Sequence, residues 1–322
     1  MFRLTVIFSL LLLFSSCGTK TETDNITPSQ WELFSYLPQN TEYLLYANLD
    51  AVRKTKAGEE NLATSLPEEP GGGWLRKFEQ ATGAGLKKGI REITIAKTRD
   101  DNAIVVVKVE KNYRKVRSYF RDSPEFQKKT DSTYSLKEMP STIVYFPGNN
   151  IVIVSNRENY IESFLSDRKN RLIANSELVS IIKNIKEKNS IWMATDKGAF
   201  AAGIFDRIAG KDSKLLSPEI LSSIDNFSVS AEFNNGAQIE SALGCTSAGN
   251  AYLIAAAVEG AIAMNILSHK NYKLGKIFDK MDINREGKLI RFHLNLSDKE
   301  IDDIKQLTKL DNQVNNSKGK LW

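Results

Sequence analysis

The chain of 322 residues contains only two histidines, His269 and His293, which leaves few positions for a general base or a metal ligand. Neither stands in an HExxH pattern or in a cysteine and histidine spacing of the kind that holds zinc. Catalysis by a serine or cysteine nucleophile needs a positioned base, and the sequence has no Gly-x-Ser-x-Gly turn. These residues therefore predict no metal site, no cofactor and no enzymatic activity.

Acidic residues stand in adjacent pairs, such as Glu68 with Glu69 and Asp302 with Asp303. Adjacent residues do not face each other on a helix. A glycosidase needs two carboxyl groups opposed across a cleft, and the sequence alone does not place such a pair. The pairs are interpreted as surface acids, and a carboxylate-dependent hydrolase is kept as the least favoured alternative.

The two cysteines have different surroundings. Cys245 ends the apolar segment Ala242-Leu243-Gly244-Cys245, which is typical of a buried small residue rather than of a nucleophile. Cys17 follows Arg3, the apolar run from Leu4 to Phe14 and two serines. This run is too short to span a bilayer and is followed at once by polar sequence, which is typical of a secretory signal.

The segment Phe14-Ser15-Ser16-Cys17 resembles the lipobox of bacterial lipoproteins, in which the signal is cut before the cysteine and the thiol is acylated. The resemblance implies a signal peptide over 1–16, a palmitate or similar lipid on Cys17, and a membrane anchor in the bacterial cell envelope. Residues 17–27 would then be a polar tether. Gly18, where some inner-membrane lipoproteins have Asp, favours the outer membrane if the organism has two. The alternative is an ordinary secreted protein with an incidental cysteine.

A basic stretch lies between Lys108 and Lys137, in a chain whose formal net charge is +5. Its central residues have periodic apolar neighbours, which predicts a helix over 112–120 with one cationic side. The stretch is a candidate contact for anionic lipid, or for another acidic polymer of the envelope. Interspersed acids favour the simpler interpretation of a solvated helix face, and an exported location disfavours nucleic acid. The candidate residues are Lys111, Arg114, Lys115, Arg117 and Arg121.

The segment from Ala248 to Leu267 is apolar nearly all round and predicts a long helix. Its length would allow a membrane span, but Glu259 and the many alanines lower its hydrophobicity. A buried helix that packs closely on a sheet is favoured. A third interpretation is an apolar pocket between this helix and the sheet, lined by Ala256 and Glu259 and able to hold an acyl chain.

The order of predicted strands and helices indicates an α+β fold made of two similar units, with antiparallel sheets whose helices pack on one face. The first unit is expected at 28–170 and the second at 171–310, followed by a polar tail at 311–322. Thr27 and Pro28 predict the first helix start, Asn234-Asn235-Gly236 a hairpin, and Ser297 with Glu300 the last helix start. The repeated order indicates a tandem duplication.

This order, with the segment Leu37-Pro38-Gln39-Asn40-Thr41 ahead of the first strand, resembles a poorly characterised class of bacterial envelope proteins with a duplicated unit. The resemblance implies no active-site residues. The function expected is binding or assembly in the envelope. The expected partners are the membrane, through the lipid on Cys17, and envelope proteins or lipid. A carrier or sensor of an apolar, lipid-like ligand is the alternative.

Overall fold

The computed structural model describes residues 26–55, 78–161, 171–185, 190–198, 218–234, 236–267, 276–277 and 279–304. The first part of the chain forms α2 (Pro28–Phe34), β1 (Thr41–Asn48), α3 (Leu49–Arg53), β2 (Ile90–Thr98), β3 (Ala103–Val109), α6 (Tyr113–Asp122), β4 (Phe126–Lys128), β5 (Thr133–Leu136), β6 (Ile143–Gly148) and β7 (Ile151–Ser155). The later part forms η1 (Leu172–Ala174), α8 (Ser176–Lys183), β8 (Ile191–Thr195), α10 (Pro218–Leu221), β9 (Ile224–Asn234), β10 (Gly236–Cys245), α11 (Ala248–Leu267), β11 (Asp282–Glu286) and β12 (Leu289–Leu296).

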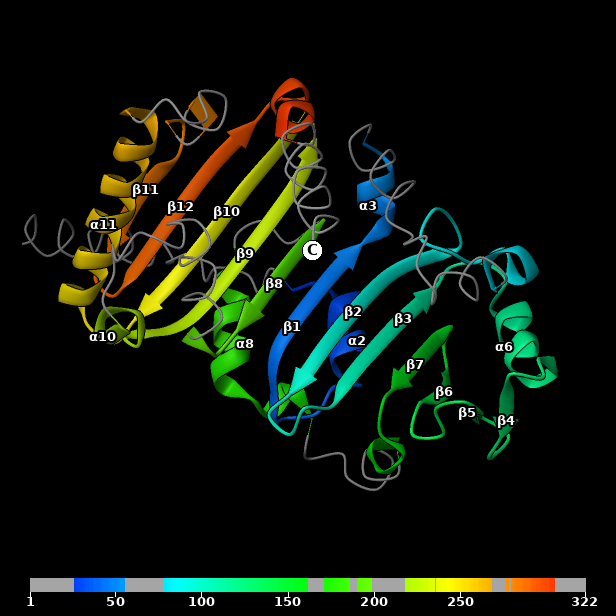
Figure 1. The fold of residues 1–322 in the computed structure, drawn as a ribbon. Coiled ribbons are helices and arrows are strands. Elements are labelled where there is room, and N and C mark those ends of the chain that lie inside the picture. The colour runs from blue at the N-terminus through cyan, green and yellow to red at the C-terminus, as the bar shows by residue number, and fades with distance from the viewer. Residues whose placement is uncertain are drawn as a thin grey trace, which may run out of the picture.

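The described strands form a single antiparallel sheet, which confirms the α+β class (Figure 1). Their order across the sheet is β11-β12-β10-β9-β8-β1-β2-β3-β7-β6-β5-β4. From the pairing of β8 with β1, the order runs β1-β2-β3-β7 in one direction and β8-β9-β10-β12 in the other. The similar halves expected from the sequence therefore share one sheet. The unit boundaries at 28–170 and 171–310, and the duplication itself, stay predictions.

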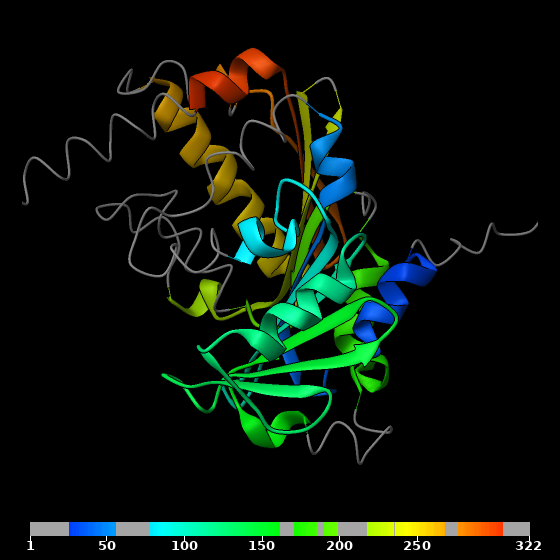
Figure 2. The same ribbon diagram turned by 90° about the vertical axis from the view of Figure 1, so that its right-hand side faces the viewer.

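Helices cover both faces of the sheet, so the expectation that they pack on one face is wrong. The helices α2 and α8 share a core with Leu44 of β1 and Trp192 of β8. Helix α11 packs with Met193, and α6 with Val107, which point to the opposite face. We call the two sides the α2 face and the α11 face. Figure 2 shows these two helices on opposite sides of the strands.

The amino-acid pattern of the strands explains why both faces need cover. Strand β7 is apolar at four successive positions, with Ile151 and Ile153 on the α2 face and Val152 and Val154 on the α11 face. Successive side chains of a strand point to opposite faces, so such a strand exposes apolar groups unless both faces are covered. If apolar and polar side chains alternated along the strand, one face could be exposed to solvent, and a single layer of helices would be sufficient to cover the other.

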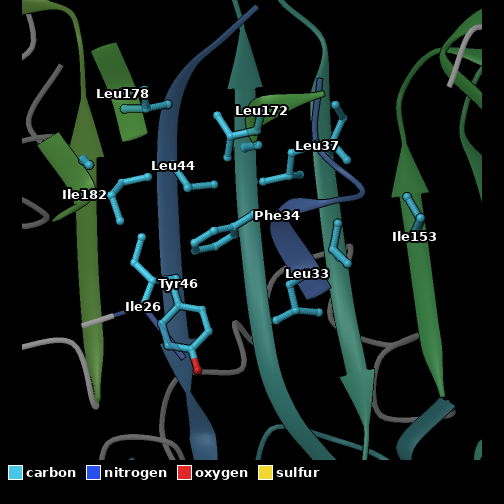
Figure 3. Close-up of a cluster of buried hydrophobic side chains, with 14 of the residues drawn as sticks. Ile26, Leu33, Phe34, Leu37, Leu44, Tyr46, Ile153, Leu172, Leu178 and Ile182 are labelled. Atoms are coloured by element: carbon cyan, nitrogen blue, oxygen red, sulfur yellow. The ribbon is translucent and has the colours of Figure 1, made fainter. Parts of the chain in front are cut away.

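Helix α2 begins at the residue that the sequence predicts. The backbone N–H of Gln30 donates to Thr27 Oγ1 over 3.2 Å, and the Thr27 N–H donates to Gln30 Oε1 over 2.8 Å. Pro28 occupies the first turn, where no intrahelical N–H bond is lost. This start directs Leu33 and Phe34 onto the sheet, where both are fully buried (Figure 3).

An aromatic cluster on the α2 face joins the two halves. The Trp192 ring of β8 stacks on Tyr46 of β1, with centroids 5.5 Å apart, and meets the Phe34 ring edge-on at 5.7 Å. All three side chains are nearly or fully buried. Large aromatic groups dominate core energetics, so this contact across β1 and β8 is a principal stabilising feature of the sheet.

A buried polar group, the Glu92 carboxylate, lies at the N-terminal end of α2. Glu92 of β2 is only 2 % exposed, and its two carboxylate oxygens each accept from Ser29 Oγ at 2.8 Å. Arg91 Nε lies 3.3 Å from Glu92 Oε1. Lys108 Nζ donates to Ser29 Oγ over 2.8 Å and pairs with Glu32 at 2.7 Å. A buried carboxylate is tolerated only with such partners, so these contacts fix α2 against β2 and β3.

The burial of β2 is opposite to what its side-chain polarity indicates. Glu92, Thr94 and Ala96 point to the α2 face and are buried, whereas Ile93 and Ile95 point to the α11 face. Ile95 is 39 % exposed. Helix α2 and the hydrogen bonds of Glu92 allow the polar side of the strand to be the inner one.

The β9–β10 hairpin and the last helix start are confirmed. Gly236 has a φ of +120°, and a Cβ there would lie 2.0 Å from the Leu296 carbonyl oxygen, so only glycine fits. The Ser297 N–H donates to Glu300 Oε2 over 2.9 Å, and the Glu300 N–H donates to Ser297 Oγ over 3.4 Å. Lys280, together with the Ser297 N–H and hydroxyl that both donate to the carboxylate, lowers the pKa of Glu300 to about 2.

Several predicted features lie outside the described residues. They are the signal peptide 1–16, Cys17, most of the tether 17–27, Glu68, Glu69, His269 and the tail 311–322.

Candidate functional site: the cationic face of helix α6

Helix α6 is attached to the α11 face of the sheet by its apolar side. Val116 and Phe120 are buried, and the Phe120 ring lies 4.7 Å from that of Phe126 and 5.6 Å from that of Phe146. Tyr134 packs on Phe146 in the same cluster. Because these rings hold α6 by one side only, its other side faces solvent.

The exposed side of α6 is cationic, as the sequence predicts. Arg114, Arg117 and Arg121 follow one another at spacings that place side chains on one side of a helix. Lys115 flanks this row, and Lys111 lies just before the helix. All five side chains are exposed. The expectation of a basic helix surface is confirmed, while its role stays a prediction.

The five cations differ in how they are paired. Arg121 Nε contacts Asp122 Oδ1 at 2.7 Å, and this pairing raises the pKa of Arg121 and lowers that of Asp122. Arg117 donates to the carbonyl oxygen of Asp131 over 2.8 Å. Within the described part of the chain, Lys111, Arg114 and Lys115 form no ion pair. These three charges are therefore available to an external anion.

An open groove with a volume of about 630 Å³ runs beside α6. Arg114 and Lys115 lie at the start of α6, and Glu125 lies beyond its end. Tyr119 lines the groove between them, and its ring meets that of Phe78 at 5.3 Å. The lining residues are Ala81, Arg114, Lys115, Ser118, Tyr119, Asp122, Ser123, Pro124 and Glu125. The sequence predicts the exposure of Arg114 and Lys115 but not the groove, because residues 78–82 meet α6 only in the folded chain.

The pocket expected between α11 and the sheet is not lined by Ala256 and Glu259. Both residues are exposed, on the side of the helix away from the strands. Ala251, Ile254 and Ala255 are the buried residues of this helix. They recur three and four positions apart and so form one stripe. The expectation was wrong because a helix with no polar side gives no sequence signal for which side meets the sheet.

Helix α11 is also not buried all round, in contrast to the favoured interpretation. Tyr252 is 58 % exposed and Leu253 is 48 % exposed. The Arg285 guanidinium of β11 lies 4.6 Å above the Tyr252 ring, a cation–π contact between helix and sheet edge. Among the described residues, no helix is long and apolar enough to cross a membrane.

An apolar strip crosses the α11 face between α11 and α6. Leu45, Ile95 and Val105 are directly opposed on β1, β2 and β3, and Ile93 and Ile191 lie in the adjoining row. All five are at least partly exposed. None belongs to the hydrophobic clusters that the described residues form beneath the two helices. Apolar groups of this central strip are therefore still in contact with solvent.

The remaining chemical groups of the described chain do not converge. His293 alternates with inward residues of β12 and contacts the Asn295 side chain, which agrees with its expected outward position. Cys245 is 2 % exposed, and burial raises the pKa of its thiol to about 11, so it is a buried protonated group. Within the described ranges, no three His, Cys, Asp or Glu side chains are grouped to hold a metal ion.

Comparison with known proteins identifies no family. No family model and no curated protein matches this chain. A solved structure with some likeness is crystal form I of a protein named TP0453, at 13 % identity and a TM-score of 0.45. The match covers 83 % of this chain and 94 % of that one.

Proposed function

We propose that this chain is a lipid-anchored protein of the bacterial cell envelope that acts by binding or assembly, without enzymatic activity. The segment that ends at Cys17 supports the anchor. The cationic face of α6 supports contact with an anionic partner, either anionic lipid or an acidic polymer of the envelope. The outer membrane is the proposed site if the organism has two membranes.

The observation that carries the proposal is the position of four exposed basic side chains on the outer side of α6, with Lys111 just before the helix, while the inner side of the helix is fixed. Val116 and Phe120 hold α6 to the sheet, so the cationic face keeps its orientation before any partner arrives. A preorganised surface loses less conformational freedom on binding. Each basic side chain near an anionic membrane contributes about 1 kcal/mol.

The anchor is tested at Cys17. Cells that express the full chain are grown with radiolabelled palmitate, and label is expected on the wild-type protein and on the Cys245→Ser variant. The Cys17→Ser variant is expected to carry none, because the acylated thiol is gone. Equal labelling of Cys17→Ser and wild type would contradict the anchor.

The anionic contact is tested by charge removal on the Cys17→Ser protein, which lacks the lipid. Binding is measured to vesicles of equal parts phosphatidylglycerol and phosphatidylcholine, and to polygalacturonate, at low and high salt. We expect salt-sensitive binding to at least one of these probes. Changing all five candidate residues to Gln is expected to abolish it, because the variant lacks the positive charges that attract an anionic surface.

The matched control removes the same charge elsewhere. Five exposed lysines outside α6 are changed to Gln, namely Lys54, Lys87, Lys137, Lys288 and Lys299. This control is expected to retain most of the binding. Equal loss in both variants, or no binding of the starting protein to either probe, would overturn the proposed contact.

A second candidate function is the carriage of an apolar ligand, and the observation that favours it is the central strip of the α11 face. Strand β2 buries its polar side and turns Ile93 and Ile95 toward solvent. Places where a strand departs from its polarity pattern are expected at functional sites. The occupant we infer is an acyl chain, which needs apolar contact and no specific hydrogen bonds along its length.

The carrier function predicts a lipid that purifies with the protein. Native mass spectrometry of the Cys17→Ser protein is expected to show an adduct with the mass of an acyl lipid. Ile95→Asp is expected to remove the adduct, because a carboxylate would lie in the apolar strip. Ile173→Asp changes an Ile that is 52 % exposed outside the strip, and is expected to retain the adduct. A bare protein mass for the Cys17→Ser protein, with Ile95 and Ile173 unchanged, would contradict this function.

A further inference from the structure

We propose that the groove beside α6 binds an acidic sugar unit, with its carboxylate or phosphate at the Arg114 and Lys115 end. This inference rests on the proposed function and names the partner class of the same surface. It assigns the specific contact to the groove rather than to the cationic face as a whole.

The groove runs along the helix because its lining residues recur four positions apart. Arg114, Ser118 and Asp122 form one row, and Lys115, Tyr119 and Ser123 form the next. Eight residues of α-helix extend about 12 Å. A ligand in this groove therefore meets side chains from both rows along the length of α6, which suits an elongated molecule with several polar groups.

The basic end of the groove is prepared for one anionic group. Arg114 and Lys115 are adjacent and exposed, and neither forms an ion pair in the described chain. A guanidinium binds a carboxylate or phosphate through two parallel hydrogen bonds, and an ammonium adds a point charge. An acidic ligand thus finds an unpaired guanidinium and an unpaired ammonium at this end of the groove.

The other end of the groove distinguishes a sugar from a bilayer. Asp122 and Glu125 are acceptors there, and Asp122 is already paired with Arg121. Carboxylate oxygens accept hydrogen bonds from hydroxyl groups but repel a plane of lipid phosphates. A saccharide offers hydroxyl donors next to its acidic group, so it satisfies both ends.

The middle of the groove supplies hydroxyl groups and an aromatic ring in fixed positions. The Tyr119 ring packs against Phe78 and Phe120, and Ser123 lines the groove beside it. Ser118 lines the same stretch. The groove of about 630 Å³ is open to solvent and lined mostly by polar residues, so a ligand there keeps one side in water. Because the Tyr119 ring is held by its neighbours, a ligand does not need to order it.

The test compares two variants that lose the same charge from the same surface. Arg114→Gln with Lys115→Gln removes the groove cations, and Lys111→Gln with Arg117→Gln removes one Lys and one Arg that do not line it. The probe, the monoacid trisaccharide, is trigalacturonic acid with two of its three carboxyl groups methyl-esterified, so that a single free acid remains for the basic end and none meets Asp122 and Glu125. Its binding to the Cys17→Ser protein is measured by calorimetry. The neutral trimethyl ester of the same trisaccharide and the phosphatidylglycerol vesicles are the comparison probes.

The expected result is an affinity for the monoacid trisaccharide that falls about tenfold or more in the groove variant and by less than about threefold in the control variant. The neutral ester is expected to bind at least about tenfold more weakly than the monoacid trisaccharide. Equal losses in the two variants would overturn the groove but leave the cationic face as the contact. Binding to vesicles without binding to the monoacid trisaccharide would also overturn it, in favour of lipid.

The double variant Ser118→Ala with Tyr119→Phe leaves the charge of the protein unchanged and removes two hydroxyl groups of the groove. A loss of about threefold or more in affinity for the monoacid trisaccharide, with unchanged vesicle binding, is expected, because these groups meet the sugar and not the membrane. Unchanged sugar affinity in this variant would contradict a specific site. If neither the starting protein nor any variant bound any of the probes, the proposed function itself would be contradicted.

Discussion

The pairing of β1 with β8 is the contact on which the rest of the structure depends. These strands are far apart in the chain, yet they are hydrogen-bonded neighbours from Tyr43 opposite Thr195 to Ala47 opposite Ile191. The rings of Tyr46, Trp192 and Phe34 cover their junction on the α2 face. Without this seam, two smaller sheets would each expose an edge to solvent, which invites association with other chains.

One continuous sheet explains how the candidate surfaces arise. Helices α2 and α8 cover the α2 face across the seam, and the opposite face carries α11 toward the β11 edge and α6 toward the β4 edge. The cationic side of α6 and the central strip at Leu45 and Ile95 therefore lie on the same side of the molecule. An anionic contact and an apolar contact on one side are compatible with a protein that meets amphipathic components of an envelope.

The sequence predicts local structure well where a side chain acts on its own backbone. Thr27 and Ser297 begin helices, Gly236 permits the hairpin, and the ends of α11 agree with the apolar segment from Ala248 to Leu267. The exposed basic side of α6 is predictable for the same reason, since the period of its apolar residues determines which side is buried.

Features that depend on distant segments were not predictable from the sequence. Glu92 is buried because Ser29 and Tyr46 come to it from other elements, and no local pattern indicates this. Helix α11 has no polar side, so the exposure of Ala256 follows only from where the strands lie. The single sheet depends on the pairing of β1 with β8. Two similar halves could instead have formed separate sheets, and no local sequence pattern distinguishes these outcomes.

Hydrogen exchange of the full chain, followed by mass spectrometry of its peptides, tests the central seam most directly. The amides of β1 and β8 are expected to exchange most slowly and to do so together, because both strands lie inside the sheet beneath the shared core. The short edge strands β4 and β11 are expected to exchange much earlier. Exchange of β1 and β8 as early as these edges, or at two clearly separate rates, would contradict a seam that unites the two halves.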